Sequence, residues 1–141
     1  MTAIDLKHKM KALKTCVIVP TYNNEGTVTE VVLSVLKCCS DVIVVNDGST
    51  DATPGLCHDL AQRDDRVQVI TQKNAGICAA RNRGLSAAEG VYVTFCDDDD
   101  LLLPGALALL LQKAEDTGAD IVRADYELVH VGPNGTETVQ P

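Results

Sequence analysis

The sequence has no tryptophan, one phenylalanine and three tyrosines, so aromatic residues make up 3% of its 141 positions. Proteins that hold nucleic acid rely on aromatic stacking platforms or on clustered Lys and Arg. This chain instead carries 20 acidic and 12 basic residues, which gives a net charge of -8. We therefore expect no nucleic-acid partner. An anionic ligand is compatible with this charge where a metal ion neutralises it locally.

Long apolar runs and paired cysteines are also missing. No stretch reaches the ~20 apolar residues of a membrane span, so we expect no transmembrane segment in this chain. The six cysteines form no C-x-x-C pair, which argues against zinc sites and disulfide frameworks. Buried thiols in a reducing compartment are the simplest interpretation, and we predict a cytoplasmic protein, or one at the cytoplasmic face of a membrane.

Residues 1–14 contain four lysines but lack the apolar core of a secretory signal. We expect them to form a flexible basic tail. The remaining residues, 15–141, are long enough for one domain with a hydrophobic core and too short for two ordinary ones.

Short apolar runs rich in β-branched residues alternate with segments of helical periodicity. The runs do not alternate cleanly between apolar and polar residues, which is typical of strands covered on both faces. This order predicts an α/β fold, a Rossmann-like and mostly parallel sheet with helices on both faces. The predicted strands are residues 16–19, 42–45, 67–70, 91–95 and 121–122, and the predicted helices are 28–39, a segment from 53, 77–88 and 104–118.

Two helix starts have recognisable caps. Thr27 with Glu30 matches a capping box, in which the threonine side chain accepts a backbone N–H of the first turn. Thr53 followed by Pro54 resembles an N-cap with proline in the first turn. After residue 120, the chain reads as a strand that enters a turn at 132–135, with a possible returning strand at 136–141.

Four consecutive aspartates, residues 97–100, follow the predicted strand 91–95. Adjacent carboxylates repel one another more strongly as water is excluded, so folding alone gives no reason to gather them there. Hard divalent cations take oxygen ligands, and ligands of open α/β sheets sit beyond the carboxyl ends of the strands. The run therefore predicts a metal site, with a solvated acidic turn as the alternative.

Three further polar clusters, residues 20–24, 46–51 and 73–76, also follow predicted strands. All four clusters should open onto one edge of the sheet. Singly, each can be ordinary turn or capping chemistry. Turn chemistry does not, however, require acids at two neighbouring strand ends.

The segments VIVPTYNNEG, VIVVNDGSTD, NAGICAARNRGLSAAEG and YVTFCDDDDLLLP resemble, in order and spacing, the signatures of family 2 glycosyltransferases with the GT-A fold. The resemblance runs from about residue 16 to residue 129. It implies an enzyme that transfers a sugar from a UDP- or GDP-linked donor to a saccharide or other hydroxyl acceptor, with inversion and with Mn or Mg as cofactor. It also implies a role in polysaccharide or glycoconjugate synthesis of the cell envelope.

The resemblance further implies roles for individual residues. Pro20 and Tyr22 correspond to residues that border the base, and Asp47 to one that hydrogen-bonds the base or ribose. Asn74 and Gly76 match positions at the base pocket.

At the acidic run, the resemblance is to the D-x-D element. Asp97 and Asp98 would face the ribose and donor sugar, Asp99 would bind the metal, and Asp100 has no assigned role. Arg81 is similar to the basic residue that lies near the nucleotide in this family.

Two departures qualify the resemblance. Asn46 stands where many family members have a first aspartate, which removes one acceptor charge near the ribose. The general base of the family lies well beyond the D-x-D, so the resemblance implies a catalytic residue beyond Pro141 and a chain that is truncated before the acceptor part. Asp120, Asp125 and Glu127 are acidic but do not match that motif.

Other functions remain open on the sequence. A non-catalytic nucleotide-sugar-binding module would show metal-dependent donor binding without transfer. A nucleotidyltransferase would need a Gly- and Arg-rich loop after the first strand, and a phosphoacceptor domain an aspartate after the third. No P-loop or dinucleotide-binding glycine motif is present. A truncated sheet edge would also favour homo-oligomers.

Overall fold

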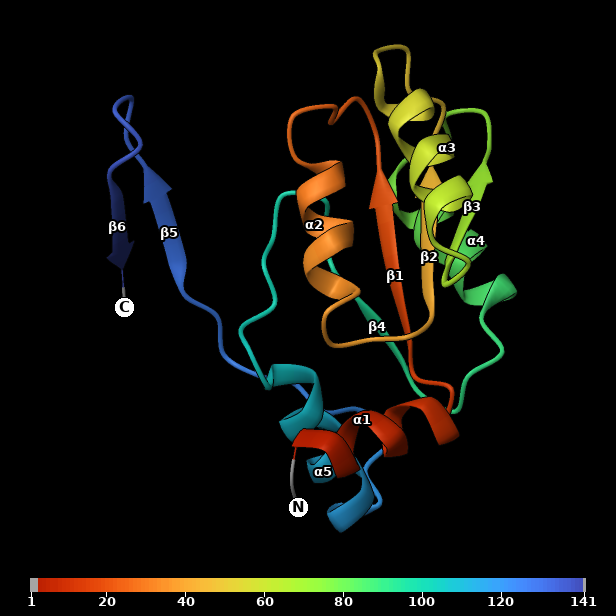
Figure 1. Cartoon of the computed structure of the whole chain (residues 1–141), viewed down its shortest axis with the longest axis vertical. Coiled ribbons are helices and arrows are strands. Elements are labelled where there is room, and N and C mark those ends of the chain that lie inside the picture. The colour runs from red at the N-terminus through yellow and green to blue at the C-terminus, as the bar shows by residue number, and fades with distance from the viewer. Residues whose placement is uncertain (1–2, 141) are drawn as a thin grey trace.

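The computed structural model describes residues 3–140, so Met1 and Thr2 of the expected tail and Pro141 lie outside the described residues. A four-stranded parallel sheet with strand order β3-β2-β1-β4 forms the centre of the fold, and Figure 1 shows it between helices. The predicted α/β class is therefore confirmed. The elements, in chain order, are α1 (Ala3–Ala12), β1 (Cys16–Thr21), α2 (Val28–Val35), β2 (Val42–Asn46), α3 (Thr53–Arg63), β3 (Val67–Thr71), α4 (Ile77–Ala87), β4 (Val93–Phe95), α5 (Ala106–Thr117), β5 (Leu128–Val131) and β6 (Glu137–Gln140).

Strands β1 and β2 are buried along their whole length, as their apolar runs predict. Alternate residues of β1 enter two different clusters. Val17 and Val19 pack with α2 and α3, whereas Ile18 packs with Ala80 of α4. The sheet is thus covered on both faces, and its central strands are held rigidly.

Helix α4 lies close to the sheet because Gly84 faces β1. A Cβ atom at Gly84 would lie 2.4 Å from Cγ2 of Ile18, far inside van der Waals contact. The absence of a side chain at Gly84 therefore allows α4 to pack directly against the central strand. The first turn of α4 lies at the end of the sheet where the strands run into their loops.

The predicted fifth strand at residues 121–122 is wrong. Those residues lie in an irregular segment, 119–127, and Ile121 is 87% exposed. A two-residue apolar run offers too few backbone pairings to hold a strand. The chain instead forms an antiparallel hairpin of β5 and β6, joined by the expected turn, which stands apart from the central sheet in Figure 1.

The N-terminal segment also differs from the expected flexible tail. Residues 3–12 form helix α1, and the side chain of Met10 is buried in the core cluster. Lys9 forms an ion pair with Glu115 of α5, at 3.6 Å. Apolar contact under the sheet, which a count of lysines does not reveal, orders this segment.

Thr27 precedes α2 and Pro54 lies in the first turn of α3, as predicted, but the predicted side-chain capping bonds of Thr27 and Thr53 are wrong. The Thr27 side chain makes no capping bond to α2. Helix α3 already includes Thr53, and the carboxylate of Asp51 accepts the Thr53 N–H at 2.9 Å. Each threonine hydroxyl is used in a contact between loops instead.

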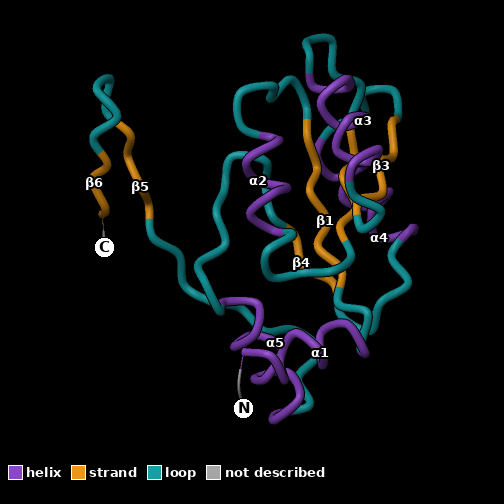
Figure 2. Tube along the Cα trace, in the orientation of Figure 1, coloured by secondary structure: helices purple, strands orange, loops and turns teal. Residues whose placement is uncertain are grey.

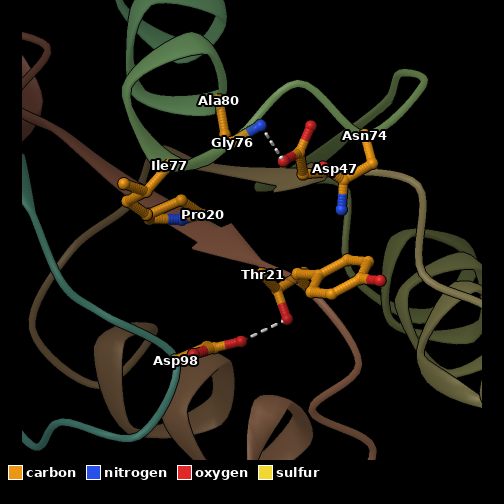
Figure 3. Close-up of a pocket in the computed structure, with 9 residues that line it drawn as sticks. Pro20, Thr21, Asp47, Asn74, Gly76, Ile77, Ala80 and Asp98 are labelled. Atoms are coloured by element: carbon orange, nitrogen blue, oxygen red, sulfur yellow. Dashed lines mark hydrogen bonds between the residues drawn. The ribbon is translucent and has the colours of Figure 1, made fainter.

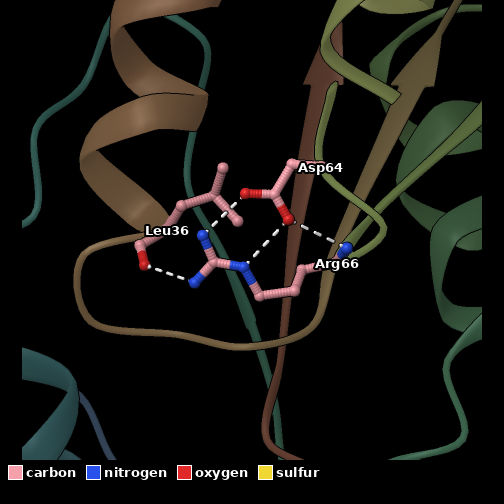
Figure 4. Close-up of polar contacts among 3 residues, drawn as sticks. All are labelled: Leu36, Asp64 and Arg66. Atoms are coloured by element: carbon pink, nitrogen blue, oxygen red, sulfur yellow. Dashed lines mark hydrogen bonds and ion pairs between the residues drawn. The ribbon is translucent and has the colours of Figure 1, made fainter. Parts of the chain in front are cut away.

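The end of α2 is fixed by Arg66, which lies in the turn before β3 (Figure 4). Arg66 donates from Nη1 to the carbonyl of Leu36 at 3.0 Å. It also binds Asp64 through Nε and Nη2, at 2.9 and 2.7 Å. These side-chain hydrogen bonds from Arg66 lower the pKa of Asp64 to about 2. This contact lies where β3 begins, at the opposite end of the sheet from the loops that follow the strands.

None of the helices within residues 3–140 is long and apolar enough to cross a membrane. All six cysteines are free thiols, and four of them, Cys16, Cys39, Cys57 and Cys96, are buried. The prediction that most thiols act as small buried hydrophobes is confirmed.

Candidate functional site

The loops that follow β1, β2, β3 and β4 gather at one end of the sheet, as the teal segments in Figure 2 show. The parallel register explains this arrangement, because Thr21 at the end of β1 pairs with Asn46 at the end of β2, and Asn46 with Thr71 of β3. The four polar clusters therefore meet at the sheet edge where α/β proteins bind ligands.

A pocket of about 390 Å³ opens between these loops (Figure 3). Its lining contains six residues to which the sequence analysis assigned a role and three to which it assigned none. The six are Pro20, Tyr22, Asp47, Asn74, Gly76 and Asp98, and the other three are Thr21, Ile77 and Ala80. The pocket thus combines a half-exposed aromatic ring, apolar side chains and two carboxylates.

Asp47 organises one wall of the pocket. Its Oδ1 accepts from Gln72 Nε2 at 2.8 Å and from the Ala75 N–H at 3.0 Å, and its Oδ2 accepts from the Gly76 N–H at 2.8 Å. Burial, at 4% exposure, would raise the pKa of Asp47, but these hydrogen bonds outweigh it and lower the pKa. Asp47 is an ionised anchor for the loop that enters α4.

The loops after β2 and β3 approach each other closely at Gly48. This residue has φ +74°, and a Cβ atom on it would lie 2.6 Å from the backbone nitrogen of Asn74. Only glycine fits both the left-handed conformation and the space. Gly48 therefore lets Asp47 reach the Gly76 loop.

Asn46, at the end of β2, is 1% exposed. Its Oδ1 accepts from the Ser49 N–H at 3.0 Å, which holds the turn after the strand. Its Nδ2 has no hydrogen-bond partner among the described residues. Asn46 therefore leaves an unused amide donor at the end of β2.

Arg81 of α4 does not line the pocket but reaches the acidic run, residues 97–100. Its Nη2 donates to Asp97 Oδ1 at 2.8 Å, and its guanidinium lies 5.5 Å from the ring centroid of Phe95. Nε of Arg81 has no partner in the described part of the chain. Arg81 thus neutralises one carboxylate of the run and keeps donor capacity.

Asp98 is the most connected residue of the run. Its carboxylate accepts from the hydroxyl of Thr21, as Figure 3 shows. Its main-chain carbonyl accepts from Thr27 Oγ1 and from Asn24 Nδ2, the latter at 3.2 Å. Asp99, the next residue, is exposed, and its side chain has no hydrogen bond or ion pair within residues 3–140.

The run fits a divalent cation through its donor chemistry, although no group of three or more His, Cys, Asp or Glu side chains is positioned to hold a metal in the part of the chain described. Burial, and then the neighbouring charges of Asp99, Asp97 and Asp98, raise the pKa of Asp100. The carboxylates therefore repel one another as they stand. Magnesium-type cations use only one or two protein carboxylates and take their other ligands from phosphates and water.

Several residues of this site escaped the sequence analysis. Gln72 makes a site contact that no local pattern signals. Thr27 was assigned to a helix cap, and Asn24 was placed at this edge only as a member of the cluster 20–24. Ile77 and Ala80 are ordinary apolar residues of an amphipathic helix. Thr21 was likewise placed at this edge as a member of the cluster 20–24, without a role of its own.

The family model described as Glycosyl transferase family 2 matches residues 16–138. Glycosyltransferase GlyA of Streptococcus pneumoniae is 40% identical over 116 residues, which cover 80% of this chain and 17% of GlyA. The curated relatives are longer, since the alignments cover between 17% and 38% of their lengths. This chain therefore spans less than two fifths of the relatives that it matches.

Two solved structures have the same fold. A mannosyltransferase from Pyrobaculum calidifontis, in complex with GDP-Man and Mn²⁺, gives a TM-score of 0.66 at 22% identity and covers 79% of this chain and 39% of its own. Glucosyl-3-phosphoglycerate synthase from Mycobacterium tuberculosis, in complex with Mn²⁺, UDP and glucosyl-3-phosphoglycerate, gives 0.63 at 24% identity, covering 79% and 43%. The predicted GT-A fold is confirmed.

Proposed function

The chain belongs to glycosyl transferase family 2, and from this premise we propose that it binds the nucleotide-sugar donor of a metal-dependent, inverting sugar transfer. We propose residues 15–141 as the donor-binding domain. The observation that carries the proposal is the pocket of about 390 Å³, which joins an aromatic and apolar wall to the acidic run through Asp98. A nucleotide needs both, because its base is flat and its diphosphate is charged.

The base and ribose occupy the pocket proper. Pro20 and Tyr22 flank the base, and Asn74 and Gly76 close its far side. Asp47 accepts one hydrogen bond from the ligand with its remaining lone pair, since an ionised carboxylate can accept about four and this one accepts three from the protein. Asp47 therefore has two roles, to shape the loop and to read a donor group of the ligand.

The diphosphate extends toward the acidic run. Asp99 would hold the divalent cation, manganese or magnesium, and the bound cation would supply Lewis-acid stabilisation of the negative charge on the leaving diphosphate. Asp97 and Asp98 face the ribose and the sugar. Arg81 supplies direct charge compensation with the donor capacity that its contact to Asp97 leaves free.

The transfer breaks the bond between the anomeric carbon and the phosphate oxygen, and the electron pair stays on the diphosphate. A new bond forms to the acceptor oxygen from the opposite face, and the acceptor proton passes to a general base. Asp120, Asp125 and Glu127 lie in the irregular segment after α5, away from the pocket lining, so we assign none of them to that role. The reaction belongs to polysaccharide or glycoconjugate synthesis on the strength of the resemblance.

Titration calorimetry tests the donor site. UDP, GDP and their common sugar conjugates are titrated into the protein with Mn²⁺ and then with a chelator. We expect one nucleotide series to bind with Mn²⁺ and to weaken when the metal is removed. If neither series binds under any condition, the proposed donor site is wrong.

A further inference from the structure

The loop between β1 and α2, residues 22–27, is tied to the acidic run at Asp98. Thr27 Oγ1 and Asn24 Nδ2 both donate to the main-chain carbonyl of Asp98. Thr21, which ends β1, donates to the Asp98 carboxylate. The strand end and the loop thus fix both the backbone and the side chain of a residue more than 70 positions away.

The same loop is anchored on its other side to the segment after β2. The Asn24 N–H donates to Thr53 Oγ1 at 2.9 Å, and Asn23 Oδ1 accepts from the Thr50 N–H at 2.7 Å. Thr53 is fully buried in the first turn of α3. The loop is therefore braced by a rigid element, and Asn24 connects that element to the acidic run through its backbone and its side chain.

We propose that Thr27 and Asn24 are positioning residues that fix the Asp98 carbonyl and thereby orient Asp99 toward the cation of the nucleotide complex. This inference rests on the proposed function. Neighbouring carboxylates repel one another and would spread the run apart. Neutral donors on a main-chain carbonyl oppose that spreading and leave the Asp99 carboxylate uncommitted. A preorganised ligand binds its cation more tightly because less ordering is lost on binding.

The position of Thr27 favours this role over helix capping. Thr27 directly precedes α2, where a threonine side chain usually caps the helix, yet its side chain makes no capping bond. Its hydroxyl instead binds Asp98. Thr29, two residues further along, has a buried hydroxyl oxygen without a partner among the described residues, so it serves as a matched control on the same helix.

The test is the Mn²⁺ affinity of the whole chain, measured by electron paramagnetic resonance of free Mn²⁺ with saturating UDP and, in a parallel series, GDP. Thr27→Val and Asn24→Ala each remove one donor to the Asp98 carbonyl. We expect each to weaken Mn²⁺ binding roughly fivefold, the equivalent of one net hydrogen bond. Thr27→Ser keeps the hydroxyl and should restore the affinity, and Thr29→Val should leave it unchanged.

Wild-type affinity in Thr27→Val would overturn the positioning role. Equal losses in Thr27→Val and Thr29→Val would also overturn it, since the effect would then come from helix packing. Thermal unfolding of each variant and of the wild type, without metal, shows whether a substitution also lowers the stability of the fold. Absence of nucleotide-dependent Mn²⁺ binding by the wild type is a different result, because it contradicts the proposed function itself and this inference with it.

Discussion

Oδ2 of Asp47 lies 2.8 Å from the backbone nitrogen of Gly76, across 29 positions of sequence. This contact joins the end of the second strand to the start of α4 and shapes the pocket between them. Asp47, which we propose to bind the ligand, therefore also builds one wall of the pocket.

Replacing Asp47 by Asn should destabilise the protein at neutral pH by about 1–3 kcal/mol, because an amide cannot accept all three hydrogen bonds. The lowered pKa of Asp47 gives the sign of the pH dependence. Its stabilisation is present above the unfolded-state pKa and is lost as the pH falls through the lower folded-state pKa. Urea unfolding at several pH values should show the two proteins converge in acid. Asp59→Asn, an exposed carboxylate on α3, should show no such difference, and parallel curves for Asp47→Asn would contradict the account.

Asp99→Ala should reduce Mn²⁺-dependent nucleotide affinity by at least about tenfold. Substitution of a residue that only supports a metal ligand already lowers metal affinity by this factor. The fold should persist, and the metal-free protein should be slightly more stable because a repelling charge next to Asp100 is gone. Calorimetry and circular dichroism measure the two effects. Asp59→Ala removes the same charge from an exposed site and should bind normally. Unchanged nucleotide affinity in Asp99→Ala would show that Asp99 is not the metal ligand.

Gly84→Ala should lower the free energy of unfolding by roughly 1–3 kcal/mol, because the new methyl group overlaps Ile18. The matched control is Gly55→Ala in α3, where no atom lies within 4 Å of the new Cβ. That variant should gain roughly 0.5–1 kcal/mol from the higher helix propensity of alanine. Chemical denaturation of both variants separates the effect of the overlap from that of helix propensity. An unchanged free energy of unfolding in Gly84→Ala would mean that α4 does not pack tightly against Ile18.

The thiols should react in a defined order. Burial is the main cause that raises the pKa of Cys16 and Cys96 to about 12 and of Cys57 to about 11, whereas Cys78 is exposed. A thiol-specific chromogenic disulfide at pH 8 should therefore label the exposed Cys78 rapidly in the native protein and all six thiols after unfolding. Cys78→Ser should remove the rapid phase. A rapid phase that survives this substitution would show that a buried region opens.

The central sheet could be predicted from the sequence because its signals are local. The β-branched runs and the polar residues that follow them placed four loops at one edge, and the pocket lining contains Pro20, Tyr22 and Asp47 as a result. The bond from Thr27 to Asp98 could not be predicted, because its partners lie 71 positions apart. A threonine before a helix gives the same sequence signal whether it caps that helix or reaches another loop.

The other errors also have physical causes. Helix α1 is ordered by the tertiary contact of Met10 with the core. The mostly polar and basic sequence of this segment does not indicate such a contact. Residues 121–122 had the composition of a strand but not the length for one, and they lie in an irregular segment. Both errors fall outside the loop edge, so the candidate site was predicted more completely than the periphery.

The central claim is that a nucleotide and a divalent cation bind together where Asp98 joins the pocket to the acidic run. Paramagnetic broadening of backbone amide resonances by substoichiometric Mn²⁺, with saturating UDP or GDP, locates that cation directly in this 15.0 kDa protein. We predict that the amides of residues 97–100 and of the loop 22–27 broaden first, and that a chelator reverses the effect. Broadening centred on other carboxylates, such as Asp64 and Asp65 below the sheet, or broadening that is independent of nucleotide, would contradict the account.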